Sequence, residues 1–183
     1  MWMLFCSLAR KWKTGVNPIP RRTPATQALG LVFWLALAYI TAAIGAIASV
    51  NAPEFYGQLM QPTWAPPAWL FGPVWTTLFT MMGIAAWLVW RSSPLEATRG
   101  TLALFIVHLA VNALWSWLFF AWNLGFWAFV ELLLLWALIV TLIFAFWRFS
   151  RVAAVLLVPY LAWVSFAGAL NFWLWRNNAG LLG

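Results

Sequence analysis

The chain has 183 residues, of which 66% are hydrophobic and only 7% are charged, and its formal net charge is +7. A soluble domain of this size cannot keep so much apolar surface away from water. The composition therefore excludes an ordinary soluble protein and indicates an integral membrane protein.

Residues 1–26 form a basic N-terminal segment without any acidic side chain. The basic residues of this segment are Arg10, Lys11, Lys13, Arg21 and Arg22. We interpret the segment as a tail that sets membrane topology, with an organelle-targeting segment as the alternative, although serine is scarce and an amphipathic period is missing. Cys6, the single cysteine, cannot form an intramolecular disulfide.

Five apolar segments follow the tail, at about residues 27–50, 71–90, 100–121, 124–147 and 152–175. Each has about 20 residues, which is the length that a helix needs to cross a bilayer core of about 30 Å. We therefore predict an all-α integral membrane fold, a five-transmembrane-helix bundle. This transmembrane domain covers residues 27–178, and residues 179–183 form a C-terminal tail.

The basic residues are distributed unevenly between the two ends of such a bundle. Residues 10, 11, 13, 21, 22, 91, 99, 148 and 151 lie on one side, and only Arg176 lies on the other. The positive-inside rule then places the N-terminus in the cytoplasm and the C-terminus outside. This placement explains the net charge without nucleic acid. We expect a bacterial inner membrane, with the mitochondrial outer membrane as the alternative.

The connection between the first two segments, residues 51–70, is long, whereas the other three connections are short. With the start of the next helix it contains "QPTWAPPAWLFGPVWT", residues 61–76. Loops of this length in compact domains are usually functional or disordered, and proline favours a fixed shape. We predict an ordered lid over the outer mouth of the bundle, where Trp64, Trp69 and Trp75 supply flat apolar faces. An interfacial tryptophan belt is the alternative.

Polar side chains inside the predicted helices are few. His108, Asn112 and Ser116 are spaced at i, i+4 and i+8, so they share one helix face. His108 is the only histidine, and no cluster of metal ligands accompanies it, so we predict no metal site. It is either a hydrogen-bonded core imidazole or an axial ligand of a haem iron, which needs only one histidine.

Glu131 is the only acidic residue within a predicted span, and it should face protein or water rather than lipid. Counting from the turn near Asn123 at 1.5 Å per residue, Glu131 and Ser116 both lie about 11 Å away, and His108 about 23 Å away. Ser116 is therefore the better expected partner. These residues do not assemble into a nucleophile, base and orienting group, so no catalytic residues are predicted.

Small side chains form two parallel rows on the first predicted helix. One row is Ala38, Ala42 and Ala46, and the other is Thr41, Gly45 and Ser49. Such rows allow helices to approach closely in lipid. They fit either packing within the bundle or a homodimer interface.

Three motifs together resemble those of a known membrane family. "FYGQLMQPTWAPPAWLFGPVWTTLFTMMGIAAWLVW", "HLAVNALWSWLFF" and "PYLAWVSFAGALNFWLW" begin at residues 55, 108 and 159. They are similar to the first-loop and second-helix, third-helix and fifth-helix motifs of the translocator protein family, which includes peripheral benzodiazepine receptors and bacterial tryptophan-rich sensory proteins. The resemblance covers about residues 29–177. It implies a five-helix bundle, often dimeric, with a ligand cavity roofed by the first loop.

The resemblance also implies ligands and ligand-binding residues. Family members bind porphyrins, including protoporphyrin IX and haem, and synthetic drugs, and some animal members bind cholesterol. The implied ligand-binding residues here are Tyr56, Pro66, Trp75, Phe79, Asn112, Ser116, Trp163 and Ala167. Possible additional contacts are Trp64, Trp69, His108 and Glu131. No cofactor is required, because porphyrin or haem is the ligand.

Two departures from the family pattern change these expectations. His108 stands where the family commonly has Gln, which could alter ligand polarity or add a haem contact. The forward cholesterol pattern needs Lys or Arg within about five residues after a Tyr. Tyr160 is followed by "LAWVS", and the next basic residue is Arg176, which puts cholesterol recognition by that motif in doubt.

Three functions follow as hypotheses. The first is a membrane receptor or carrier for tetrapyrroles, acting in porphyrin homeostasis or stress signalling. The second is an enzyme that degrades porphyrins in a light- and oxygen-dependent reaction, as the resemblance suggests. The third is a membrane scaffold or sensory partner that uses the small-residue rows of the first helix.

Overall fold

The computed structural model describes residues 22–183 and is helical, with no strand in that range. Five helical segments are long and apolar enough to cross a membrane, as predicted. They are α2 (Pro24–Ala48), α4 (Phe71–Ser92), α5 (Leu95–Ser116) with the π-helical turn η2 (Trp117–Ala121), α6 (Gly125–Trp147), and α7 (Arg151–Leu156) followed by α8 (Val158–Asn177). The shorter helices are α3 (Ala52–Gln58), the 3₁₀ turn η1 (Ala68–Leu70) and α9 (Ala179–Leu182).

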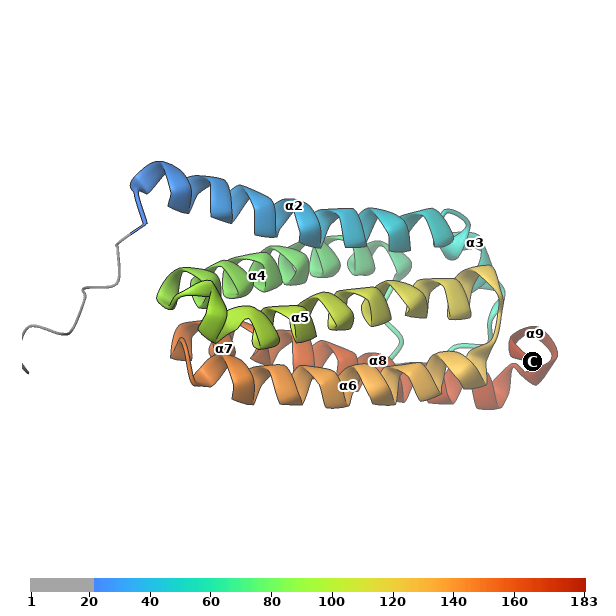
Figure 1. Ribbon diagram of the computed structural model, residues 1–183. Helices are drawn as coiled ribbons and strands as arrows, with labels where there is room; N and C mark the ends of the chain where they lie inside the picture. Colours follow the sequence, from blue (N-terminus) through green and yellow to red (C-terminus); the bar gives the residue numbers. More distant parts are fainter. Residues whose placement is uncertain (1–21) are drawn as a thin grey trace, which may run out of the picture.

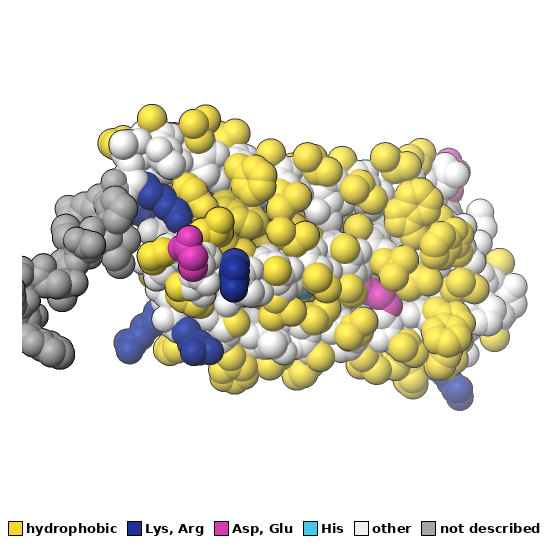
Figure 2. Space-filling model, viewed as in Figure 1, with side chains coloured by type: hydrophobic (Ala, Val, Ile, Leu, Met, Phe, Trp, Pro, Cys, Tyr) yellow, Lys and Arg dark blue, Asp and Glu magenta, His cyan; other side chains and the backbone are white. Residues whose placement is uncertain are grey.

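The long helices run roughly parallel to one another and form one bundle (Figure 1). Helix α2 packs on α4 and α5, and α6 packs on α5, α7 and α8. Large apolar side chains cover the outside of the bundle, including Phe33, Phe144 and Val152 (Figure 2). An apolar exterior is unsuited to water and suits hydrocarbon, so the exposed surface agrees with a membrane-spanning bundle.

Helix bounds differ from the sequence-based ranges mainly where polar or proline residues occur at helix ends. Helix α2 begins at Pro24, inside the predicted tail, because Thr23 caps it by accepting a hydrogen bond from the Thr26 N–H at 3.2 Å. Helix α5 begins at Leu95, immediately after a proline. The last span is divided at Leu157, because Pro159 lacks the N–H needed to continue α7. Residues 1–21 of the predicted tail lie outside the described residues.

Basic side chains gather at the end of the bundle where α2 begins (Figure 2). The described members of this group are Arg22, Arg91, Arg99, Arg148 and Arg151, whereas Arg176 lies in the last turn of α8 at the other end. The Arg22 guanidinium lies 3.5 Å from the centroid of the Trp90 ring and donates a hydrogen bond to the Ser93 carbonyl at 3.3 Å. This contact joins the start of α2 to the end of α4.

Small residues bring α2 and α4 into close contact. A Cβ atom added at Gly83 would lie 2.9 Å from Leu35 Cδ2 and 3.2 Å from the Trp34 carbonyl oxygen. Ala38 and Gly45 of the predicted rows are buried inside the bundle, so these positions serve packing within one chain. A homodimer stays a prediction.

We expect Gly83→Ala to destabilise the bundle by about 1–3 kcal/mol, because its methyl group would overpack the α2–α4 contact. Gly168→Ala on α8 is the matched control, since nothing lies within 4 Å of its added Cβ. The control should be neutral or stabilising, because alanine favours a helix over glycine by about 1 kcal/mol. Thermal unfolding in detergent, followed by circular dichroism, measures both. Equal melting temperatures for the two variants would contradict the close contact.

Candidate functional site

A cavity of about 400 Å³ lies between α2, α4 and α5 and is closed at one end by α3 and η1. Its lining residues belong to the half of the bundle near α3, away from the basic end (Figure 1). Aromatic residues dominate its wall: Tyr39, Tyr56, Phe71, Trp75, Phe79, Trp115 and Phe120. A largely apolar enclosure with few polar groups is the usual form of a small-molecule site.

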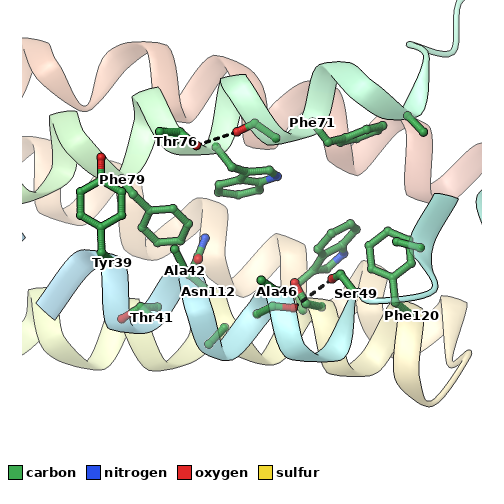
Figure 3. Close-up of a pocket in the computed structure, with 18 of the residues that line it drawn as sticks. Tyr39, Thr41, Ala42, Ala46, Ser49, Phe71, Thr76, Phe79, Asn112 and Phe120 are labelled. Atoms are coloured by element: carbon green, nitrogen blue, oxygen red, sulfur yellow. Dashed lines mark hydrogen bonds between the residues drawn. The ribbon is translucent and has the colours of Figure 1, made fainter. Parts of the chain in front are cut away.

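Small residues of α2 create the space for this cavity. Ala42, Ala46 and Ser49 lie across the cavity from aromatic side chains (Figure 3), and Gly45 lines the cavity between them. The Ser49 hydroxyl donates to the Gly45 carbonyl at 2.9 Å, so its proton is used within the helix. Because these side chains are short, α2 can lie beside α4 without filling the volume between them.

A hydrogen bond between Tyr39 and Thr80 links α2 and α4 near one end of the cavity. The two hydroxyl oxygens are 2.7 Å apart, and the Thr80 hydroxyl donates to the Thr76 carbonyl at 2.8 Å. Tyr39 must therefore donate to Thr80, since each hydroxyl has one proton. The link fixes the spacing of the two helices where the cavity begins.

The aromatic wall is held in place by rings and by one amide. The Trp75 and Phe79 rings lie with their centroids 5.6 Å apart, and Trp115 stacks on Phe119 at 5.4 Å. The Trp115 Nε1–H donates to Asn171 Oδ1 at 3.2 Å, and Asn171 Nδ2 donates to the Gly125 carbonyl at 2.9 Å. Asn171 thus connects α5, α6 and α8 and fixes the Trp115 ring at the cavity.

The polar floor of the cavity consists of Asn112 and the two buried residues behind it. Asn112 Nδ2 donates to the Tyr160 hydroxyl oxygen at 2.8 Å, and the same oxygen lies 2.9 Å from His108 Nε2. Asn112 lines the cavity, whereas His108 and Tyr160 do not. The cluster anchors α8 to α5 in the middle of the bundle.

The first loop is ordered and forms a lid. The Tyr56 hydroxyl donates to the Pro66 carbonyl at 3.2 Å, and Gln61 Nε2 donates to the Tyr56 carbonyl at 2.6 Å. Burial raises the pKa of the Tyr56 phenol above its ordinary value, which keeps the hydroxyl protonated and able to donate. These two bonds fold residues 56–66 back on α3.

The C-terminal end of the chain holds the lid down. Asn178 Oδ1 accepts from the Met60 N–H at 2.7 Å, and its Nδ2 donates to the Met60 carbonyl at 3.0 Å. Leu182 of α9 is buried with Tyr56 and beside Gly125, where an added Cβ would lie 2.9 Å from Leu182 Cβ. Residues 179–183, interpreted from sequence as a tail, thus include the short helix α9, which packs beside Gly125 at the start of α6.

The structure brings many of the predicted site residues together. Tyr56, Trp75, Phe79, Asn112 and Ser116 all line the cavity. Sequence reasoning did not assign the α2 face or the aromatic residues Phe71, Trp115 and Phe120 to the site. The rows of small residues on α2 could have indicated the cavity, but the same rows equally predict close packing between helices.

Other predicted residues lie behind or outside the cavity wall. Trp163 packs on Phe71, with centroids 5.9 Å apart, because the aromatic side chains of α4 and α5 stand between α8 and the cavity. Ala167 lines only a second hollow of about 20 Å³. Pro66 is buried within the lid but does not line the cavity. Trp64 and Trp69 are 47% and 71% exposed, on the outside of the lid.

His108 and Glu131 were predicted as possible additional ligand contacts, but neither of them lines the cavity. His108 is fully buried against Phe105 and Tyr160 and does not reach the cavity, so the core-imidazole interpretation describes it. Neither carboxyl oxygen of Glu131 has a hydrogen-bond partner among the described residues. The expected Ser116–Glu131 pair is wrong, because Ser116 faces Gly45 of α2. Residues at equal depth can point in different directions.

No group of three potential metal ligands occurs within residues 22–183.

Sequence comparisons match residues 30–176 to the TspO/MBR family. The chain is 42% identical over 144 residues to a tryptophan-rich protein TspO of Chlorobaculum tepidum, covering 74% of this chain and 89% of that one. It is 40% identical over 132 residues to the translocator protein of Homo sapiens, covering 71% and 78%. It is 35% identical over 149 residues to a tryptophan-rich sensory protein of Cereibacter sphaeroides, covering 79% and 92%.

We expect Asn178→Ala to release the lid, because Met60 would lose both hydrogen bonds that hold it. If these hydrogen bonds stabilise the closed lid by about 1–2 kcal/mol, their loss corresponds to a roughly 5- to 30-fold faster hydrogen exchange at the Met60 amide. Asn177→Ala is the matched control, since Asn177 donates only to the Trp173 carbonyl of its own helix. Exchange measured by mass spectrometry over residues 51–70 tests this. Equal exchange in both variants would show that Asn178 does not hold the lid.

Proposed function

Because the chain belongs to the TspO/MBR family, we propose that its cavity binds a flat tetrapyrrole such as protoporphyrin IX or haem. In this proposal the protein is a membrane receptor or carrier that acts in porphyrin homeostasis or stress signalling. The named relatives are translocator and sensory proteins, which agrees with a receptor-like role in a membrane.

The observation that carries the proposal is the shape of the cavity lining. The Phe79 ring of α4 lies opposite the short side chain of Ala42 on α2 (Figure 3), and the rings of Trp75 on α4 and Trp115 on α5 line the same cavity. Flat apolar ligands pack well on such rings, which favour offset-stacked and edge-to-face contacts. The volume of about 400 Å³ lies within the range of about 300–1,000 Å³ typical of ligand sites.

The proposed ligand would be held by packing rather than by coordination from His108. This histidine is fully buried behind Asn112 and donates to, or accepts from, the Tyr160 hydroxyl. It would have to leave that hydrogen bond to reach an iron atom in the cavity. Binding of a metal-free porphyrin should therefore be as favourable as binding of haem.

The proposed orientation follows from the charges. The end of the bundle that carries Arg22, Arg91 and Arg148 would face the cytoplasm, since short cytoplasmic segments favour basic residues. The cavity and its lid would then lie in the outer half of the membrane. A bacterial inner membrane is the proposed location.

We expect Ala42→Phe to weaken protoporphyrin IX binding at least tenfold, because the new ring would fill space beside Phe79 (Figure 3). Ala43→Phe is the matched control, since Ala43 is exposed on the outer face of the same helix and does not line the cavity. Quenching of tryptophan fluorescence in detergent, measured in the dark, gives both affinities. The control should bind as tightly as the unchanged protein.

Two results of this titration would speak against the proposal. Quenching that never saturates would mean that the porphyrin dissolves in detergent, and equal weakening by both variants would place the site elsewhere.

Illumination of the saturated complex then separates binding from degradation. A product that forms in proportion to protein and requires Trp75 would favour the enzymatic alternative.

A further inference from the structure

Three buried polar side chains meet at one hydroxyl group behind the cavity. The Tyr160 oxygen lies 2.9 Å from His108 Nε2 and accepts a hydrogen bond from Asn112 Nδ2 at 2.8 Å. His108 and Tyr160 are fully buried, and Asn112 is 6% exposed. Asn112 alone of the three lines the cavity. The hydrogen-bonded route from His108 to the cavity therefore runs through Tyr160 and Asn112.

Proton counting couples the two ends of this cluster. A tyrosine hydroxyl has one proton to donate, and an asparagine amide has an acceptor end and a donor end. When Asn112 donates to Tyr160, His108 Nε2 is the only other partner of the Tyr160 hydroxyl among the described residues, so the Tyr160 proton is satisfied only if Nε2 accepts it. If Nε2 instead carried a proton and donated to Tyr160, the Tyr160 proton would point at Asn112, whose acceptor end would have to face it.

The Asn112 amide in the structure is oriented as in the first of these two arrangements, which assigns the His108 proton to Nδ1, an atom without a hydrogen-bond partner among the described residues. Asn112 Nδ2 donates to Tyr160, and Asn112 Oδ1 has no hydrogen bond with any described residue, although it is not sealed from the cavity. The cavity floor therefore offers a hydrogen-bond acceptor. A ligand N–H or O–H would satisfy it, whereas a ligand carbonyl would leave two acceptors facing each other.

We propose that His108, acting through Tyr160, determines which end of the Asn112 amide faces the cavity and so selects ligands that present a hydrogen-bond donor. His108 is a positioning residue in this scheme, because it never touches the ligand. The inference rests on the proposed ligand-binding role of the cavity but not on a tetrapyrrole as the ligand.

Other polar groups at the cavity do not depend on His108. The Thr76 hydroxyl donates to the Gly72 carbonyl, and the Tyr56 hydroxyl donates to the Pro66 carbonyl. The Ser116 hydroxyl can rotate to donate or accept. These groups stay the same when only residue 108 is changed, so a change in ligand selectivity reports on Asn112.

The test uses two flat tricyclic probes of similar shape, carbazole with an N–H donor and fluorenone with a carbonyl acceptor. Affinities are measured by tryptophan fluorescence quenching in detergent. The unchanged protein should bind carbazole about tenfold more tightly, since an unsatisfied buried acceptor costs about 1–3 kcal/mol. In His108→Leu, Tyr160 loses its acceptor and donates to Asn112 Oδ1, so the amide turns its donor end to the cavity and fluorenone should bind more tightly.

Two further variants separate positioning from packing. Phe105→Leu disturbs the ring beside His108, with centroids 5.7 Å apart, but leaves the hydrogen bonds intact and should keep the carbazole preference. His108→Gln can donate or accept, so the preference should fall to within about threefold. A purely structural role of His108 would weaken both probes together and leave their ratio unchanged, which would overturn the inference.

A second measurement does not depend on ligand binding. His108 is the only histidine in the chain, so nitrogen-15 labelling of histidine gives signals from one imidazole. The inference requires the proton on Nδ1 and a bare Nε2 at neutral pH. A proton on Nε2 would overturn it even if porphyrin binds. If neither the probes nor protoporphyrin IX bind the unchanged protein, the proposed function fails, and the selectivity fails with it.

Discussion

The absence of water inside a bilayer is the constraint on which this structure depends. A polar side chain there must find a protein partner, because no solvent is available to replace a missing hydrogen bond. The chain meets this constraint with a few side chains that each connect separate helices. Tyr160 joins α8 to two residues of α5, and Asn171 joins α8 to α5 and α6. Since apolar contacts between helices gain little over contacts with lipid, these polar links give the bundle much of its specificity.

The same constraint explains where the cavity forms. At the basic end, Gly83 lets α2 lie directly on α4, and Arg22 covers Trp90. Beyond the Tyr39–Thr80 hydrogen bond, short α2 side chains face large rings that are fixed from behind. The Trp115 ring cannot turn into the gap without losing its hydrogen bond to Asn171. A space between small residues and anchored aromatic residues therefore persists, and the hydroxyl groups of Thr41, Ser49 and Thr76 beside it donate to carbonyls of their own helices.

The fold was largely predictable from sequence, and the site only in part. Five apolar runs determine five spans, because each run must satisfy its backbone in lipid by forming a helix. Residues such as Trp75 and Asn112 were found at the cavity, since motif and helical spacing both placed them on an inward face. Trp163 is also on an inward face, but Phe71 stands in front of it. Which of two inward rings lies nearer the centre depends on packing between helices, and local spacing does not contain that information. The pairing of Asn178 with Met60 joins positions 118 residues apart and could not be predicted locally.

The two buried asparagines show how the same side chain can serve either the fold or the site. Asn171 uses its acceptor end for Trp115 and its donor end for the Gly125 carbonyl, so both ends of this amide hold helices together. Asn112 uses only its donor end, on Tyr160, and its oxygen has no partner among the described residues. An amide that is half satisfied in a low-dielectric interior is unfavourable unless something else completes it. The cavity in front of Asn112 is where such a group can enter, and a ligand that supplies a donor would replace the hydrogen bond that the protein itself leaves open.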